Sequence, residues 1–164
     1  ILEAAARLAD VPDLRFVLVG DGPEKQLLVR LARERGLGNV RFLDAIGREK
    51  MPALLASADV SLVPLRMTLP GAVPSKIYEA MGAGVPIVLI SEGEAAALVG
   101  RSGAGLVVAP GDAAGAASAI RKLASDPDLR RNMGKAGREA ALRDFDRRGI
   151  AARFHQLLES EIAC

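Results

Sequence analysis

A short apolar run in the second half of the chain limits the folds that this sequence can adopt. Every residue from Val85 to Leu89 is apolar, and Gly82 and Gly84 close a predicted helix just before this run. A strand of this composition has no polar face to turn toward solvent, so both of its faces must be covered. Helices packed on both faces of a parallel sheet provide such cover. The run therefore predicts an α/β domain.

The rest of the sequence alternates between strand and helix patterns. The other expected strands are Phe16–Val19, Val40–Leu43, Val60–Pro64 and Leu106–Val108. The expected helices are Ile1–Ala9, Pro23–Arg35, Glu49–Ala58, Pro74–Gly82, Glu92–Gly100, Asp112–Ala124, Asp126–Arg143 and Asp146–Glu161. This alternation predicts one domain with a mainly parallel sheet and right-handed crossovers, whose ligands bind outside the carboxyl ends of the strands.

Composition excludes several classes of function. The net charge is only +2 and aromatic residues make up 3% of the chain, which disfavours a dedicated nucleic-acid-binding protein. The single cysteine, Cys164, allows no internal disulfide, as is usual in the cytosol. No signal peptide or apolar run of membrane-spanning length is visible. The chain starts at Ile1 in a helical pattern, from which we expect a piece of a longer protein.

Metal and histidine chemistry are not expected from this sequence. No cluster of histidine, cysteine and acidic residues has the spacing of a metal site. His155 is the only histidine and has no catalytic partner near it in the sequence, so we expect it to be structural or to face solvent. We expect Tyr78, the only tyrosine, to be a packing residue.

The helix that begins at Ser75 is the main candidate site. A helix start presents free amide donors and positive potential, and Lys76 adds a positive charge there, which suits a phosphate group. Glu79 lies four residues after Ser75, about one turn along the same face, where its carboxylate can accept from hydroxyl groups. Together they predict a site for a nucleoside diphosphate and its ribose. The simpler alternative is an ordinary helix start with a solvated lysine.

Two weaker signals favour a structural interpretation. The turn Gly20–Pro23 can place amides near a phosphate or sugar, but Lys25 stands where a dinucleotide-binding fingerprint needs glycine. The C-terminal third is basic and can meet anionic lipid headgroups, although interleaved acidic residues favour a solvated helix face. Its basic residues are Arg130, Arg131, Lys135, Arg138, Arg143, Arg147, Arg148 and Arg153.

Three segments resemble one protein family. The runs Phe16–Pro23, Val40–Leu43 and Pro74–Val88 resemble the C-terminal domain of GT-B glycosyltransferases, and more narrowly the retaining "glycosyl transferases group 1" family. Ala56–Val60 matches a helix-to-strand element of that family, and Glu79–Pro86 carries its most specific motif. The resemblance implies a Rossmann-like, three-layer α/β/α fold, which is one half of a GT-B glycosyltransferase.

The resemblance also implies a role for particular residues in binding a nucleotide-sugar donor. The matching positions are Gly20, Gly22, Ile46, Ser75, Lys76, Ile77 and Glu79. Residues 75–77 would meet the diphosphate through amides or side chains, and Glu79 would hold the ribose hydroxyls. Ile46 falls in the loop that contacts the base, and the two glycines form a turn near the donor.

The resemblance implies a metal-independent transfer, with no cofactor, from a UDP-sugar to a polysaccharide, glycolipid or lipid-linked acceptor. The expected location is the cytoplasm or the inner face of the membrane, with peripheral membrane association of the full enzyme. The family's N-terminal acceptor domain and the first strand of this domain would lie outside residues 1–164. We therefore expect these residues alone not to catalyse transfer.

One position departs from the family pattern. Gly71 stands where the family often has a second glutamate, so the resemblance assigns no carboxylate beside the sugar. Two alternatives therefore stay open. One is a non-catalytic module that binds a nucleotide-sugar or stabilises a partner subunit, and the other is an enzyme like the UDP-sugar 2-epimerases. GDP or another carrier in place of UDP is open as well.

Overall fold

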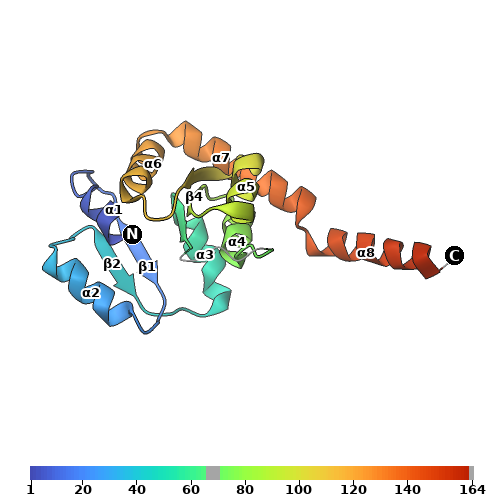
Figure 1. The fold of residues 1–164 in the computed structure, drawn as a ribbon, viewed down its shortest axis with the longest axis horizontal. Coiled ribbons are helices and arrows are strands. Elements are labelled where there is room, and N and C mark those ends of the chain that lie inside the picture. The colour runs from blue at the N-terminus through green and yellow to red at the C-terminus, as the bar shows by residue number, and fades with distance from the viewer. Residues whose placement is uncertain (66–70, 163–164) are drawn as a thin grey trace.

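The computed structural model describes residues 1–65 and 71–162 of the 164-residue chain (Figure 1). Residues 66–70 and 163–164, which include Cys164, lie outside this description. The strands are β1 (Phe16–Val19), β2 (Val40–Leu43), β3 (Ser61–Pro64), β4 (Ile87–Ile90) and β5 (Gly105–Val108). Each observed strand pair is parallel, as predicted.

The helices follow the predicted order, with ends that differ by a few residues. They are α1 (Leu2–Ala6), α2 (Lys25–Glu34), the 3-10 helix η1 (Arg48–Lys50), α3 (Met51–Ala56), α4 (Ser75–Ala83), α5 (Gly93–Ser102), α6 (Ala113–Ser125), α7 (Pro127–Asp144) and α8 (Arg147–Ile162). Asp112 and Asp126, where two helices were predicted to begin, are N-caps: the Asp112 carboxylate accepts from the Gly115 amide at 2.7 Å and that of Asp126 from the Leu129 amide at 2.8 Å.

Two predicted helix ends were wrong. The first helix was expected to reach Ala9, but it ends at Ala6, where the Ala9 amide donates to the Ala6 carbonyl in a tighter turn. Gly82 was expected to help end the fourth helix, but it lies inside α4. Gly84 ends that helix alone, at φ 71°, a left-handed conformation that glycine adopts without strain.

Strand β4 is buried on both faces, as its composition predicts. Ile87 and Leu89 pack into a core cluster with residues of α4, α5 and α7. Val88, which points the other way, packs into a second cluster with residues of α1 and α6. The sheet of β3, β4 and β5 is therefore the middle of three layers, and α4 is held in place by the apolar face that it shares with β4 (Figure 1).

The expected sheet is present as two separate parallel sheets. One contains β1 and β2, and the other has the strand order β3-β4-β5. Phe16 of β1 belongs to the same core cluster as Val88, so the two sheets share a core on the α1 and α6 side. Helix α2 covers one face of the smaller sheet, while Val17 on the other face is 50% exposed.

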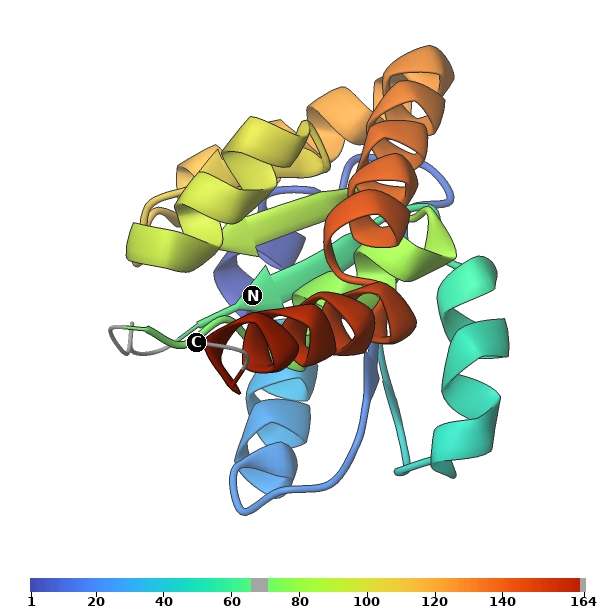
Figure 2. The same cartoon turned by 90° about the vertical axis from the view of Figure 1, so that its right-hand side faces the viewer.

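Helix α7 packs closely along α4, whereas α8 leads away from the sheets. At two glycines of α7, Gly134 and Gly137, the helix approaches α4 and the segment that follows it. Helix α8 extends to one side of the molecule in Figure 1 and lies in front of the sheets when viewed from that side in Figure 2. The position of α4 therefore depends on β4 and on α7.

We predict that Gly134→Ala destabilises the protein by about 1–3 kcal/mol, the usual cost of overpacking. A β-carbon at position 134 would overlap the Gly84 carbonyl oxygen, so α7 would have to move away from α4. The matched control is Gly100→Ala in α5, where a β-carbon has no neighbour within 4 Å. Urea unfolding of both variants measures the difference in the free energy of unfolding, and equal stability of the two would contradict the close packing of α7.

Candidate functional site

The turn after β1 and the loop after β2 lie side by side. The two strands are parallel with Val19 opposite Leu43, so the chain leaves both of them at the same edge. The Gly20 amide donates to the Leu43 carbonyl at 3.3 Å, which extends the pairing into the turn. Gly20 has a φ of 140°, and only glycine adopts this conformation readily. The glycine turn predicted at this position is thus a backbone requirement of the fold.

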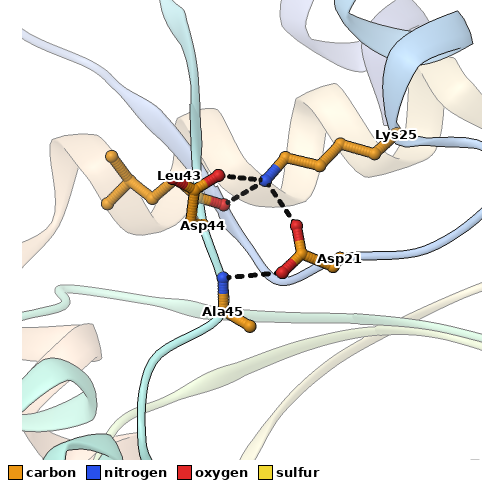
Figure 3. A network of polar contacts seen from close by, with 5 residues as sticks. All are labelled: Asp21, Lys25, Leu43, Asp44 and Ala45. Carbon is orange, nitrogen blue, oxygen red and sulfur yellow. Dashed lines mark hydrogen bonds and ion pairs between the residues drawn. The ribbon is translucent and has the colours of Figure 1, made fainter.

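A lysine ties the turn and the loop together (Figure 3). The Nζ atom of Lys25, in the first turn of α2, donates to Asp21 Oδ1 at 2.9 Å, Asp44 Oδ1 at 2.8 Å and the Leu43 carbonyl at 3.1 Å. The second carboxylate oxygen of Asp21 accepts from the Ala45 amide at 3.3 Å. We call this arrangement of Asp21, Lys25, Leu43, Asp44 and Ala45 the lysine latch.

The electrostatics of the lysine latch favour its charged form. The hydrogen bond from Lys25, followed by that from the Ala45 amide, lowers the pKa of Asp21 below its ordinary value. The hydrogen bonds to Asp44 and then Asp21 raise the pKa of Lys25 above its ordinary value. Both shifts widen the pH range over which Lys25 and Asp21 are charged, so the ion pair between these two residues persists through neutral pH.

Two predicted donor-binding residues border the lysine latch. Gly22 is exposed, and open space surrounds the position where its β-carbon would be. Ile46 follows Ala45 directly and is 36% exposed, which is unusual for isoleucine. Both positions are therefore accessible to a ligand at this edge of the smaller sheet.

The start of α4 has the geometry of an anion site. Pro74 occupies the N-cap in an extended conformation, and among the described residues no side chain caps this end. The first amide groups of a helix have no acceptor within the helix, so those of Ser75 and Lys76 can donate outward. Both residues are exposed. The amide donors, the positive end of the helix dipole and the charge of Lys76 are thus all found at the exposed start of α4.

The structure narrows the role predicted for Ile77. Its side chain is fully buried in the core beside Met81 and Ile87, so it is not available to a ligand. Its amide donates to the Pro74 carbonyl at 3.1 Å. Of the two contacts that the resemblance allows, through the amide or through the side chain, burial leaves only the amide, and its contact with the diphosphate stays a prediction. Glu79, by contrast, is exposed one turn further along α4.

The predicted site residues fall into two groups. The lysine latch joins the turn that contains Gly20 and Gly22 to the loop that contains Ile46. Ser75, Lys76 and Glu79 stand on α4, which packs on the other sheet. Within residues 1–65 and 71–162, no hydrogen bond or ion pair links the two groups.

The sequence analysis did not predict that Asp21, Lys25 and Asp44 would come together. Lys25 drew notice only because it breaks a glycine fingerprint, and Asp44 was not singled out. Two signals were available: Lys25 lies four residues after Asp21, and Asp44 directly follows a strand that is parallel to β1.

The only histidine and the only tyrosine of the chain have the solvent-facing and packing roles that were expected of them. His155 is exposed on α8, where its Nε2 lies 3.2 Å from Glu159 Oε1. The ring of Tyr78 packs against that of Phe145, with centroids 4.8 Å apart, which confirms its packing role. Within the described parts of the chain, no group of three or more histidine, cysteine or acidic side chains could hold a metal ion. No helix found there is long and apolar enough to cross a bilayer.

Comparison with known proteins gives a family and several relatives. The sequence profile described as "Glycosyl transferases group 1" matches residues 1–140. The GDP-mannose-dependent alpha-(1-6)-phosphatidylinositol monomannoside mannosyltransferase of Mycolicibacterium smegmatis is 35% identical over 153 residues. That match covers 90% of this chain and 40% of the relative.

Two solved structures share the fold over nearly the whole chain. The sucrose-phosphate synthase of Thermosynechococcus elongatus is similar with a TM-score of 0.80 and 30% identity, covering 99% of this chain and 42% of that one. Anabaena Alr3699/HepE in complex with UDP-glucose has a TM-score of 0.79 and 27% identity. This match covers 97% of this chain and 44% of that one. The chain thus spans less than half the length of each of these proteins.

Proposed function

Because this chain belongs to the glycosyl transferases group 1 family, we propose that it binds the nucleotide-sugar donor of a sugar transfer reaction. The observation that carries the proposal is the exposed start of α4, where uncapped amides, Lys76 and Glu79 lie within about one turn of helix. A nucleoside diphosphate needs an anion site and, a few ångströms away, an acceptor for ribose hydroxyls. One helical turn rises about 5.4 Å, which suits this separation.

In the proposed arrangement the diphosphate lies at the amides of Ser75 and Lys76, with the Lys76 ammonium beside it. Glu79 accepts from the ribose hydroxyls. Such a site stabilises the charge that develops on the leaving diphosphate, because the helix dipole and the lysine are already in place before the reaction. We propose on this ground that the transfer proceeds without a metal cofactor.

The other group of residues serves the base end of the donor in this proposal. Gly22 and Ile46 are accessible at the edge of the smaller sheet, next to the lysine latch in sequence. Parallel α/β sheets bind ligands outside the carboxyl ends of their strands, and the turn, the loop and α4 all follow such ends. A donor that extends from one sheet to the other would use both groups.

For the donor and the acceptor, we propose a UDP-sugar and a lipid-linked or polysaccharide acceptor. One structural relative is in complex with UDP-glucose, while the name of a sequence relative specifies GDP-mannose and a phosphatidylinositol mannoside. The proposed location is the cytoplasm or the inner face of the membrane. Exposed arginines on the last two helices, including Arg131 and Arg148, offer positive charge for anionic headgroups there.

The division into two sheets supports a proposal about the whole domain. Among the described residues, β1 pairs with β2 alone and β3 pairs with β4 alone, although both sheets contribute to one core cluster. Parallel strands are normally paired and covered on both sides, yet β1 and β3 each have an open edge. We propose that a strand from outside residues 1–164 pairs with both edges and joins the sheets.

The open edge of each strand can be tested by amide exchange. Phe16 and Gly20 donate toward β2, and successive residues alternate, so the Val17 amide points to the open edge. The same alternation in β3 points the Leu62 amide outward. In the natural protein that carries this chain, we predict that both amides exchange at least ~10-fold more slowly than the exposed Ala72 amide. Exchange as fast as that of Ala72 would contradict the added strand.

For the donor site, we predict that Lys76→Ala and Glu79→Ala each weaken UDP binding by about 10-fold, the loss expected when one charge-assisted hydrogen bond worth about 1.4 kcal/mol is removed. Isothermal titration calorimetry on the natural protein measures the change.

The matched controls are Lys135→Ala and Glu139→Ala. These two residues are also an exposed lysine and glutamate on one helix, α7, with Nζ 3.9 Å from Oε1. Both control variants should bind UDP as the wild-type protein does. Unchanged affinity in both the Lys76 and Glu79 variants would overturn the proposed function.

A further inference from the structure

The lysine latch satisfies the hydrogen-bonding capacity of its central group. The Lys25 ammonium has three N–H donors, and three acceptors surround it, one each from Asp21, Leu43 and Asp44. The Lys25 side chain is only 22% exposed, although the carboxylates of Asp21 and Asp44 are 64% and 96% exposed. The lysine is thus held between the two loops, while the acids remain at the surface.

The lysine latch holds the loop that presents Ile46. Asp44 and Ala45 are the two residues before Ile46. The Asp44 carboxylate accepts from Lys25, and the Ala45 amide donates to Asp21. The next backbone hydrogen bond along the chain is that of the Lys50 amide to the Gly47 carbonyl, which belongs to the start of η1. The position of Ile46 relative to the Gly20 turn therefore depends on Asp21 and Lys25.

The fold itself has other support at this place. Helix α2 is anchored by apolar residues, since Ala32 is buried and Leu28 and Leu31 pack on the same cluster with Phe42 of β2. Exposed ion pairs generally contribute little to the free energy of unfolding. Loss of the Lys25 charge should therefore free the loop and leave the domain folded.

We propose that Asp21, Lys25 and Asp44 are positioning residues that hold the Ile46 loop in the arrangement that receives the base of the donor nucleotide. This inference rests on the proposed function, and it adds residues whose role is to hold the loop in place. Their effect is confined to the base end, because the start of α4 lies on the other sheet and has its own anchor in the core. Donor affinity and the preference among bases then depend on the three polar residues that hold this loop.

The test replaces Lys25 by methionine, which keeps most of the side-chain volume and removes the three donors. The probes are UDP and uridine, which carry a base, and inorganic pyrophosphate, which does not. We expect Lys25→Met to weaken UDP and uridine binding by about 5–10-fold, with pyrophosphate affinity within about twofold of wild type. Lys25→Arg keeps the charge and should restore most of the loss. Lys122→Met, at an exposed lysine of α6, is the control and should change nothing.

Thermal unfolding checks that the variants fold. If Lys25→Met does not fold, Asp44→Ala removes one acceptor of the lysine latch at a side chain that is 96% exposed, and it should show the same base-selective loss. UDP affinity equal to that of wild type, or an equal loss for UDP and pyrophosphate, would overturn this inference and leave the proposed function intact. A wild-type protein that binds neither UDP nor pyrophosphate would overturn the proposed function, and this inference with it.

Discussion

The packing of α4 against β4 is the contact on which the rest of this structure depends. Ile77 and Met81 of α4 are fully buried against Ile87 and Leu89 of β4, and Gly84 makes the tight turn that lets the chain pass from one element to the other. Successive residues of a helix are turned by about 100°, so Lys76 and Glu79 do not share the face of Ile77, and they stay exposed while Ile77 is buried. The packing that forms the core thus also places the candidate anion site, and α7 packs on α4 as well.

The smaller sheet is organised by a different kind of interaction. Helix α2 covers one face of β1 and β2 with apolar residues, while a lysine and two aspartates connect the loops at their carboxyl ends. Apolar contacts determine where the strands lie, and directional hydrogen bonds determine how the loops are presented. A domain that binds one extended ligand across two sheets needs both: a rigid anion site at α4 and a loop held in a defined position at the other end.

Much of this could be predicted from sequence, because the signals are local. The uniform apolar character of Val85–Leu89 predicted a strand buried on both faces, and Asp112 and Asp126 predicted helix starts through capping. The differences arose where tertiary packing decides: Gly82 is inside a helix because α4 continues along the sheet, and packing in the core buries the Ile77 side chain. The lysine latch escaped notice because Asp44 is far from Lys25 in sequence and meets it only through the pairing of β1 with β2.

The most direct test of the central claim is a crystal structure of the natural protein with UDP bound. The diphosphate should lie within hydrogen-bonding distance, about 2.7–3.2 Å, of the Ser75 and Lys76 amides, with a ribose hydroxyl on the Glu79 carboxylate. The base should lie toward Gly22 and Ile46. A diphosphate bound away from the start of α4, with Lys76 and Glu79 both in solvent, would contradict the assignment of this helix as the donor site.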